Sequence, residues 1–182
     1  MSLEGPLPMT RVRELQDAFD RTFSEPPRAS VGQHEDFLAI TLGSDPYAMR
    51  LSDVAALFLS RHITGLPGSV PALLGLVALR GALVPAYDLG SLLGYPKSAS
   101  ARWLAVILDG RVAVGFGQFD GHVRVSRDAI AEAPSGGTAS RQPLVRESLH
   151  IEGGVRPIVH LPSVLEAVAA MVRHAARPKE QE

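Results

Sequence analysis

The side chains from which a catalytic or metal site could be built are histidine, aspartate and serine, because the 182-residue chain has no cysteine. Thiol nucleophiles, cysteine-ligated zinc, iron–sulfur clusters and disulfides are therefore excluded. No two histidines have the H-x-H or H-x-x-x-H spacing that brings two imidazoles to one metal ion. We therefore expect no metal centre. The histidines are His34, His62, His122, His150, His160 and His174.

The serine and glycine motifs of common enzymes are also incomplete. In the segment 90–94, Gly-Ser-Leu-Leu-Gly, the serine stands one position too early for the G-x-S-x-G nucleophile elbow. Gly115 and Gly117 lack the third glycine of a dinucleotide-binding turn, and the sequence has no phosphate loop of the Walker type. Asp88 and His160 each stand between an apolar strand and a helical turn, where capping of backbone N–H groups is favoured over catalysis. We predict no catalytic residue and no cofactor.

Arg80 is the charged residue whose position most favours binding. It follows an apolar run interrupted by one glycine, and it precedes Gly81, where the backbone must turn. We therefore expect the guanidinium to project from the end of a well-anchored strand. A guanidinium held in this way suits a bidentate contact with a carboxylate or a backbone carbonyl of a partner. The alternatives are a solvated turn arginine and an internal ion pair.

The composition predicts one folded domain, because the chain is 46% hydrophobic and 20% charged. A chain of this size buries about 70% of the surface of its unfolded form. The formal charge of −1, from 18 basic and 19 acidic residues, argues against nucleic acid or an anionic membrane as the main partner. The uncharged stretch 62–79 contains three glycines and two prolines, so it is not a membrane-spanning helix. The first residues lack the apolar region of a secretory signal, so we predict a cytoplasmic protein.

Two helices are predicted on either side of a β-rich centre. Apolar residues at spacings of three and four predict an amphipathic helix over 10–23, which Pro26 and Pro27 end. This helix either packs on the body of the protein or binds a partner. A second helix is predicted over 162–173, with proline in its first turn and basic residues toward its end. Between the helices, short β-rich runs occupy 37–42, 47–51, 76–79, 83–89, 103–108, 111–116 and 122–126.

The chain repeats itself, which indicates two similar β lobes in one domain. Residues 37–42 align with 103–108 at an offset of 66, and residues 79–93 align with 151–165 at an offset of 72. The two offsets differ by the length of a short loop insertion. Short twisted strands curled into small barrels would cover the edges that a flat sheet exposes. The fold class predicted from the residues is therefore mainly β.

The segment 66–95 resembles the most specific signature of the CheW-like domain of bacterial chemotaxis coupling proteins. That signature is a string of the form lP-x-x-P-x-x-i-G-l-i-n-l-R-G-x-i-v-P-v-x-D-L. The flanking segments are similar to the rest of the family, so the resemblance extends from about residue 35 to about residue 175. The matching positions are Leu66, Pro67, Pro71, Gly75, Leu79, Arg80, Gly81, Pro85, Asp88 and Leu89.

The resemblance implies a fold of two intertwined five-stranded β-barrels with a hydrophobic seam between them. It also implies a non-catalytic adaptor that joins the regulatory domain of a CheA-type histidine kinase to the cytoplasmic tip of chemoreceptors. Further CheW-like domains are candidate partners. In the family, the arginine of the R-G pair lies at a partner-binding surface, to which the strand after the first hairpin contributes. The implied partner-binding residues are Arg80, Gly81, Leu79, Val54 and Ala56.

These inferences divide the chain into an N-terminal helical arm and linker at 1–33, a CheW-like domain at 34–178 and a tail at 179–182. Three positions depart from the family pattern. Its usual asparagine is Ala78, its usual acidic residue on the contributing strand is Ala56, and the corresponding acidic position of the second half is Arg124. Such charge changes alter the choice of partner more than the fold. We therefore expect a divergent member.

The seam between the lobes offers an alternative function, because it could form the pocket of a sensor for a small molecule or a peptide. An apolar seam with few polar groups would favour the adaptor. Several buried polar groups that converge on the seam would favour the sensor.

Overall fold

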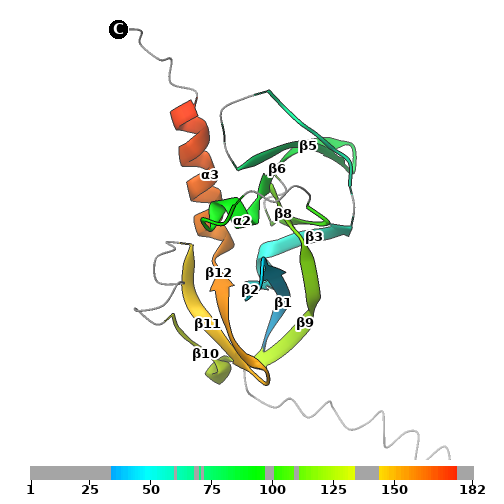
Figure 1. The fold of residues 1–182 in the computed structure, drawn as a ribbon. Helices are drawn as coiled ribbons and strands as arrows, with labels where there is room; N and C mark the ends of the chain where they lie inside the picture. Colours follow the sequence, from blue (N-terminus) through cyan, green and yellow to red (C-terminus); the bar gives the residue numbers. More distant parts are fainter. Residues whose placement is uncertain are drawn as a thin grey trace, which may run out of the picture. The chain divides into compact units, whose positions relative to one another are not determined.

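The structure is a computed structural model that describes residues 34–59, 61–67, 70, 72–96, 101–108, 111–133 and 144–175. The helix predicted over 10–23, the arm at 1–33 and the tail at 179–182 lie outside these residues. The described part is mainly β, as predicted (Figure 1). Its strands are β1 (His34–Leu42), β2 (Asp45–Arg50), β3 (Val54–Leu59), β4 (Ile63–Thr64), β5 (Leu73–Leu79), β6 (Ala82–Asp88), β7 (Trp103–Ile107), β8 (Ala113–Phe116), β9 (Gln118–Ser126), β10 (Ile130–Glu132), β11 (Val145–Ile151) and β12 (Gly154–Val159).

The strands form two six-stranded sheets. Sheet A has the order β10-β11-β12-β2-β1-β9, and sheet B has the order β3-β7-β8-β6-β5-β4. The family resemblance implied five strands in each lobe. The sixth is a short edge strand, β10 or β4, of three and two residues respectively. Each sheet contains one parallel pair, β2 with β12 in sheet A and β6 with β8 in sheet B, and its other pairs are antiparallel.

The two sheets have the same strand order if each strand is replaced by its counterpart in the other repeat. The first repeat contains β1 to β6 and the second contains β7 to β12. Sheet A takes β1 and β2 from the first repeat and its other strands from the second, whereas sheet B takes β7 and β8 from the second and its other strands from the first. Neither sheet is therefore made by one repeat alone. This exchange of strand pairs is the intertwining that the resemblance implied, and it means that a lobe is not the same unit as a repeat.

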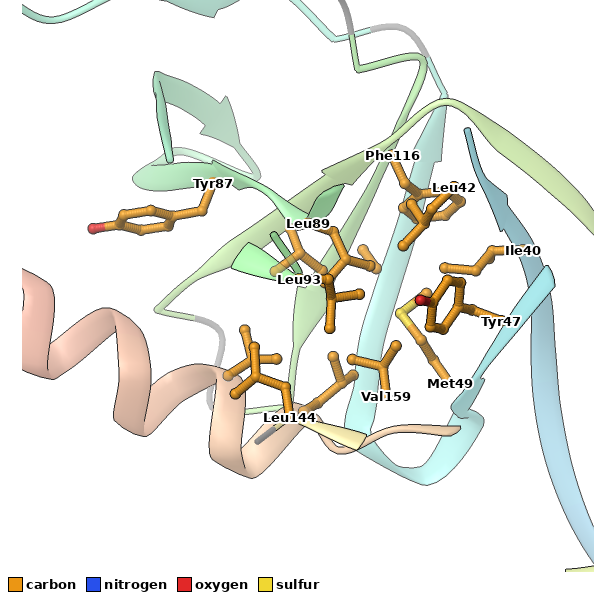
Figure 2. Close-up of a cluster of buried hydrophobic side chains, with 14 of the residues drawn as sticks. Ile40, Leu42, Tyr47, Met49, Tyr87, Leu89, Leu93, Phe116, Leu144 and Val159 are labelled. Atoms are coloured by element: carbon orange, nitrogen blue, oxygen red, sulfur yellow. The ribbon is translucent and has the colours of Figure 1, made fainter. Parts of the chain in front are cut away.

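Three apolar clusters fill the domain. One lies within sheet A, around Phe37 and Leu149, and a second lies within sheet B, around Val77 and Leu104. The third contains side chains from both sheets, and it forms the predicted hydrophobic seam. Figure 2 shows part of this seam cluster, in which side chains of β1 and β2 lie near Leu89 and Leu93, while the Tyr87 ring points away from them. The labelled side chains are Ile40, Leu42, Tyr47, Met49, Tyr87, Leu89, Leu93, Phe116, Leu144 and Val159.

The helical elements lie at equivalent places in the two repeats. Helix α2 (Leu89–Leu92) follows β6, and α3 (Leu161–Ala175) follows β12, which confirms the predicted C-terminal helix. Helix α3 buries one face in the seam through Leu161, Val164 and Val168. Short 3₁₀ turns, η1 (Leu51–Asp53) and η2 (Arg127–Ala129), follow β2 and β9.

Gly75 is the glycine that the packing of sheet B most requires. Its φ is +145°, and a Cβ added there would lie 2.1 Å from the backbone carbonyl oxygen of Thr64 on β4. The residue also stands at a register shift in the β5–β6 ladder. Any side chain at this position would therefore push β4 away from β5 while forcing the backbone into an unfavourable region.

Gly75→Ala should lower the free energy of unfolding by about 2–4 kcal/mol, from backbone strain and from the clash with a main-chain atom that cannot rotate away. Urea denaturation measures the loss. The matched control is Gly117→Ala. A Cβ added at Gly117 would meet nothing within 4 Å, and the φ of Gly117 lies outside the region that favours glycine. Equal stability of the two variants would contradict the close approach of β4 and β5.

Candidate partner-binding site

A two-residue turn presents Arg80 at the end of the β5–β6 hairpin. Leu79 pairs with Ala82, so Arg80 and Gly81 are the two central residues of the turn. Their φ angles are +49° and +84°. Two consecutive positive φ values are typical of the type I′ turn, whose twist matches that of the flanking strands. Arginine is an unusual residue in this turn, because the left-handed conformation costs about 1–2 kcal/mol for a residue with a Cβ.

The Arg80 side chain is exposed, and within the described part of the chain it has no hydrogen bond and no ion pair. An internal ion pair was one alternative from the sequence, and the described residues do not contain it. Leu83, three residues farther along the hairpin, is 71% exposed. Leu79 is only 6% exposed and packs in the interior cluster of sheet B. The hairpin is therefore anchored by Leu79, and it carries an exposed guanidinium at its turn and an exposed apolar side chain on the following strand.

Val54 and Ala56 lie apart from this hairpin. Both belong to β3, the edge strand of sheet B, and three strands separate β3 from β5. Both side chains are half-buried, with Val54 against the seam cluster and Ala56 against the interior cluster of sheet B. The five residues predicted from the sequence thus come from a hairpin and from an edge strand of one sheet, and Ala56 and Leu79 pack in the same interior cluster. Their role in binding stays a prediction.

The equivalent hairpin of sheet A carries the opposite charge. Glu152 and Gly153 join β11 to β12, at the positions that align with Arg80 and Gly81 at the offset of 72. Glu152 is exposed, and Val155, the counterpart of Leu83, is 46% exposed. Prediction from the sequence singled out neither Leu83 nor Glu152. The internal alignment already contained the signal, because it pairs a basic tip with an acidic one.

Asp88 and His160 have the capping role that the sequence favoured. The backbone N–H of Ser91 donates to Oδ2 of Asp88 at 3.0 Å, and the Ser91 hydroxyl donates to the same oxygen at 2.6 Å. In the second repeat the backbone N–H of Ser163 donates to Nδ1 of His160 at 3.3 Å. These bonds satisfy N–H groups that the first turn of a helix leaves without partners. Each side chain thus fixes the start of a helix.

Charged side chains gather on sheet A. Arg50 donates to Glu35 at 2.9 Å and to Glu147 at 2.7 Å, and Arg127 also donates to Glu35. The pKa of Glu35 is lowered, chiefly by the hydrogen bond from Arg50. Glu35, Arg50 and Arg127, together with neighbours on β1 and η1, line an open depression of about 630 Å³. The ion pairs of Glu35 with Arg50 and Arg127 join β1, β2 and η2 across this depression.

Arg124, one of the departures from the family pattern, is also paired. It donates to both carboxylate oxygens of Asp36, at 3.0 and 2.9 Å, across the β1–β9 ladder. The hydrogen bonds from Arg124 are the main cause that lowers the pKa of Asp36. The pair is exposed, so its contribution to stability is small. This arginine is therefore engaged within its own sheet.

The seam is apolar. Among the described residues, the buried polar or charged side chains are Asp88, Ser148 and Ser163, and the first and last belong to the helix caps. At one end of the seam, a cleft of about 430 Å³ opens between the β1–β2 turn and the residues that follow α2. There Tyr95 hydrogen-bonds to Asp45 and Tyr47 of β2, and burial raises the pKa of Tyr95.

Comparison with known proteins agrees with this geometry. The model of the CheW-like domain family matches residues 36–169. The chain belongs to the CheW-like domain family. Membership places it among domains that act as adaptors in chemotaxis signalling.

A solved structure shows the same fold. The chain is similar to the scaffolding protein TtCheW from Thermoanaerobacter tengcongensis, with 17% sequence identity and a TM-score of 0.61. The match covers 70% of this chain and 89% of that protein. No curated protein matches the chain. In the described residues, no helix has the length and apolar character needed to cross a membrane.

Glu35→Gln should reduce the sensitivity of the fold to acid. The pKa of Glu35 in the folded protein lies below its ordinary value of 4.5. The carboxylate therefore stabilises the fold above that value, and the stabilisation is lost as the pH falls through the folded-state pKa. Urea denaturation at about pH 7 and about pH 3 should show a smaller decrease in the free energy of unfolding for Glu35→Gln than for the parent.

The matched control for this measurement is Glu166→Gln, because Glu166 is an exposed glutamate on α3. It should lose as much stability in acid as the parent does. If both variants show the same pH dependence, the ion-paired network around Arg50 does not hold Glu35 in its charged form.

Proposed function

We propose that the chain is a non-catalytic adaptor that couples chemoreceptors to a CheA-type histidine kinase in the cytoplasm. The observation that carries the proposal is the exposed Arg80 guanidinium, fixed on a two-residue turn and without a partner among the described residues. Membership in the CheW-like domain family supports it. The regulatory domain of the kinase and the cytoplasmic tip of the receptor are the proposed partners.

The hairpin has the physical properties of a small recognition site. The β5–β6 ladder holds the turn, so little backbone entropy is lost when Arg80 meets a partner carboxylate. A bidentate contact between guanidinium and carboxylate gives strength and orientation together. Leu83, exposed beside it, would exclude water from that contact and strengthen it. Arg80 and Gly81 are therefore the centre of the proposed site, and Leu79 is its anchor.

An adaptor needs two surfaces that can be occupied at once. In sheet B the hairpin lies toward one side of the sheet and β3, with Val54 and Ala56, forms the opposite edge. We propose the hairpin as the first surface and β3 as the second.

The sensor is the second candidate function. Of the three buried polar or charged side chains in the described residues, Asp88 and Ser163 serve helix caps, so few polar groups converge on the seam and the adaptor is favoured. The ligand site of a sensor would then be the cleft beside Tyr95. Its volume of about 430 Å³ is within the usual size of a ligand pocket. A small molecule that raises the melting temperature of the parent, but not of a variant with a bulky residue at Gly43 in the cleft, would favour the sensor.

Arg80→Asn separates binding from folding. Asparagine tolerates the left-handed conformation better than arginine, so the free energy of unfolding should stay within about 1 kcal/mol of the parent or rise. Removing one member of a buried charge pair costs about 2–5 kcal/mol of binding, so affinity for the regulatory domain of the kinase or for the receptor tip should fall at least about thirtyfold. Titration calorimetry and a thermal melt on the same variant measure both effects.

The control variant for binding is Arg146→Asn, which removes an exposed arginine from β11 in sheet A. It should bind both partners as the parent does. Arg80→Glu reverses the charge and should weaken binding further. A stable Arg80→Asn variant that binds the kinase and the receptor normally would remove the hairpin from the proposed site.

A further inference from the structure

The two sheets protect their equivalent edges differently. Edge strand β9 of sheet A carries Asp120, His122 and Arg124, and its ladder with β1 is interrupted by a register shift. Charges and irregular pairing on an edge prevent another strand from adding to it. Edge strand β3 of sheet B has the sequence Val-Ala-Ala-Leu-Phe-Leu, without any charge. It too has a register shift, at Ala55, but the regular part Ala56–Leu59 is wholly apolar.

β3 is covered on its faces but open along its outer edge. It pairs with β7 on one side, and no described strand pairs with its other side. Leu57 packs against the seam cluster, and Phe58 packs against the interior cluster of sheet B, yet both are only half-buried. Leu59 is 48% exposed. A strand added along β3 would complete the burial of both faces while satisfying the backbone groups of the edge.

Opposite charges stand at the two ends of this apolar strand. Asp53 precedes β3 in η1, and Arg61 follows it. Arg61 stacks over the Phe58 ring, 5.2 Å from its centroid, which holds the guanidinium beside the strand. Neither charge forms an ion pair with another residue in the described ranges. An antiparallel copy of the same strand would bring the acidic end of one beside the basic end of the other, at both ends.

We propose that β3 is a self-association edge, on which β3 of a second copy of this chain adds in the antiparallel direction. The two copies of sheet B then form one continuous sheet, related by a two-fold axis through the paired strands. The apolar side chains of the two strands cover one another, and Asp53 of each copy faces Arg61 of the other. The charge complementarity selects a second copy over an unrelated strand, since the strand supplies its own matching ends.

The dimer does not depend on the partner proposed for Arg80. Strands β7, β8 and β6 separate β3 from β5 in sheet B, so the proposed strand pairing does not use the β5–β6 hairpin. The dimer would, however, occupy Val54 and Ala56, and a partner that needs these residues would compete with it. Dimerisation and binding at Arg80 can therefore be tested, and can fail, separately.

Sedimentation velocity on the full chain over a range of concentrations should show a reversible monomer–dimer equilibrium. Leu59→Lys places a charge on the open edge and should raise the dissociation constant of the dimer at least about tenfold. Ala131→Lys is the matched control, because Ala131 is an exposed alanine on β10, an edge strand of sheet A. It should leave the dimer unchanged. Thermal melts of both variants show whether each remains folded.

Charge reversal tests the antiparallel arrangement itself. Asp53→Arg and Arg61→Asp should each weaken the dimer about tenfold, because each converts two attractive pairs into repulsive ones. The double variant, Asp53→Arg with Arg61→Asp, should restore the parent dissociation constant to within about threefold. Arg80→Asn should dimerise as the parent does, whether or not it has lost its partner.

Two results would overturn the proposal. The first is a full chain that stays monomeric at its highest soluble concentration, which would leave the β3 edge to a strand of another protein. The second is a dimer that Leu59→Lys does not weaken and that the double reversal does not restore. Such a dimer would form through a different surface.

Discussion

The apolar seam between the sheets is the contact on which the rest of the structure depends. It holds together two sheets that each lack two strands of their own repeat, because β1 and β2 lie in one sheet while β3 to β6 lie in the other. Opening the seam would therefore separate strands that are consecutive in the chain. The parallel pairs, β2 with β12 and β6 with β8, join a strand of one repeat to a strand of the other inside each sheet. Stability of either lobe requires both repeats.

Packing inside sheet B supports the turn at its surface. The β5–β6 hairpin rests on Leu79 in the sheet B interior, and at the other end of β6 the Asp88 cap fixes the start of α2. This support holds Arg80 at a φ of +49°, which an arginine does not adopt readily. Such a conformation persists where the surrounding structure determines it. The energetic cost at one turn residue is offset by burial elsewhere, and the result is a fixed backbone turn from which the Arg80 side chain projects.

Apolar runs in the sequence predicted strands β1, β2 and β5 to β9, and the internal repeat predicted two lobes. The position of Asp88 before a helical turn predicted its cap. The exchange of strands between lobes could not be inferred in this way, because parallel pairing of β2 with β12 joins segments more than a hundred residues apart. For the same reason, the sequence did not show that Val54 and Ala56 lie on an edge strand, which three strands separate from β5. The burial of Leu79 could have been predicted from the sequence, since alternation along β5 directs its side chain inward, as it does for Val77.

The two repeats differ mainly in the residues that they expose at the surface. Asp88 with Ser91 and His160 with Ser163 make the same kind of cap from different residues, so the internal geometry has been kept. The exposed hairpin tips differ in sign, Arg80 against Glu152. The equivalent edge strands differ in protection, with charges on β9 and none on β3. A duplicated fold with a common core and unlike surfaces presents two different faces from one rigid body, which is the physical requirement of a protein that must hold unlike partners at once.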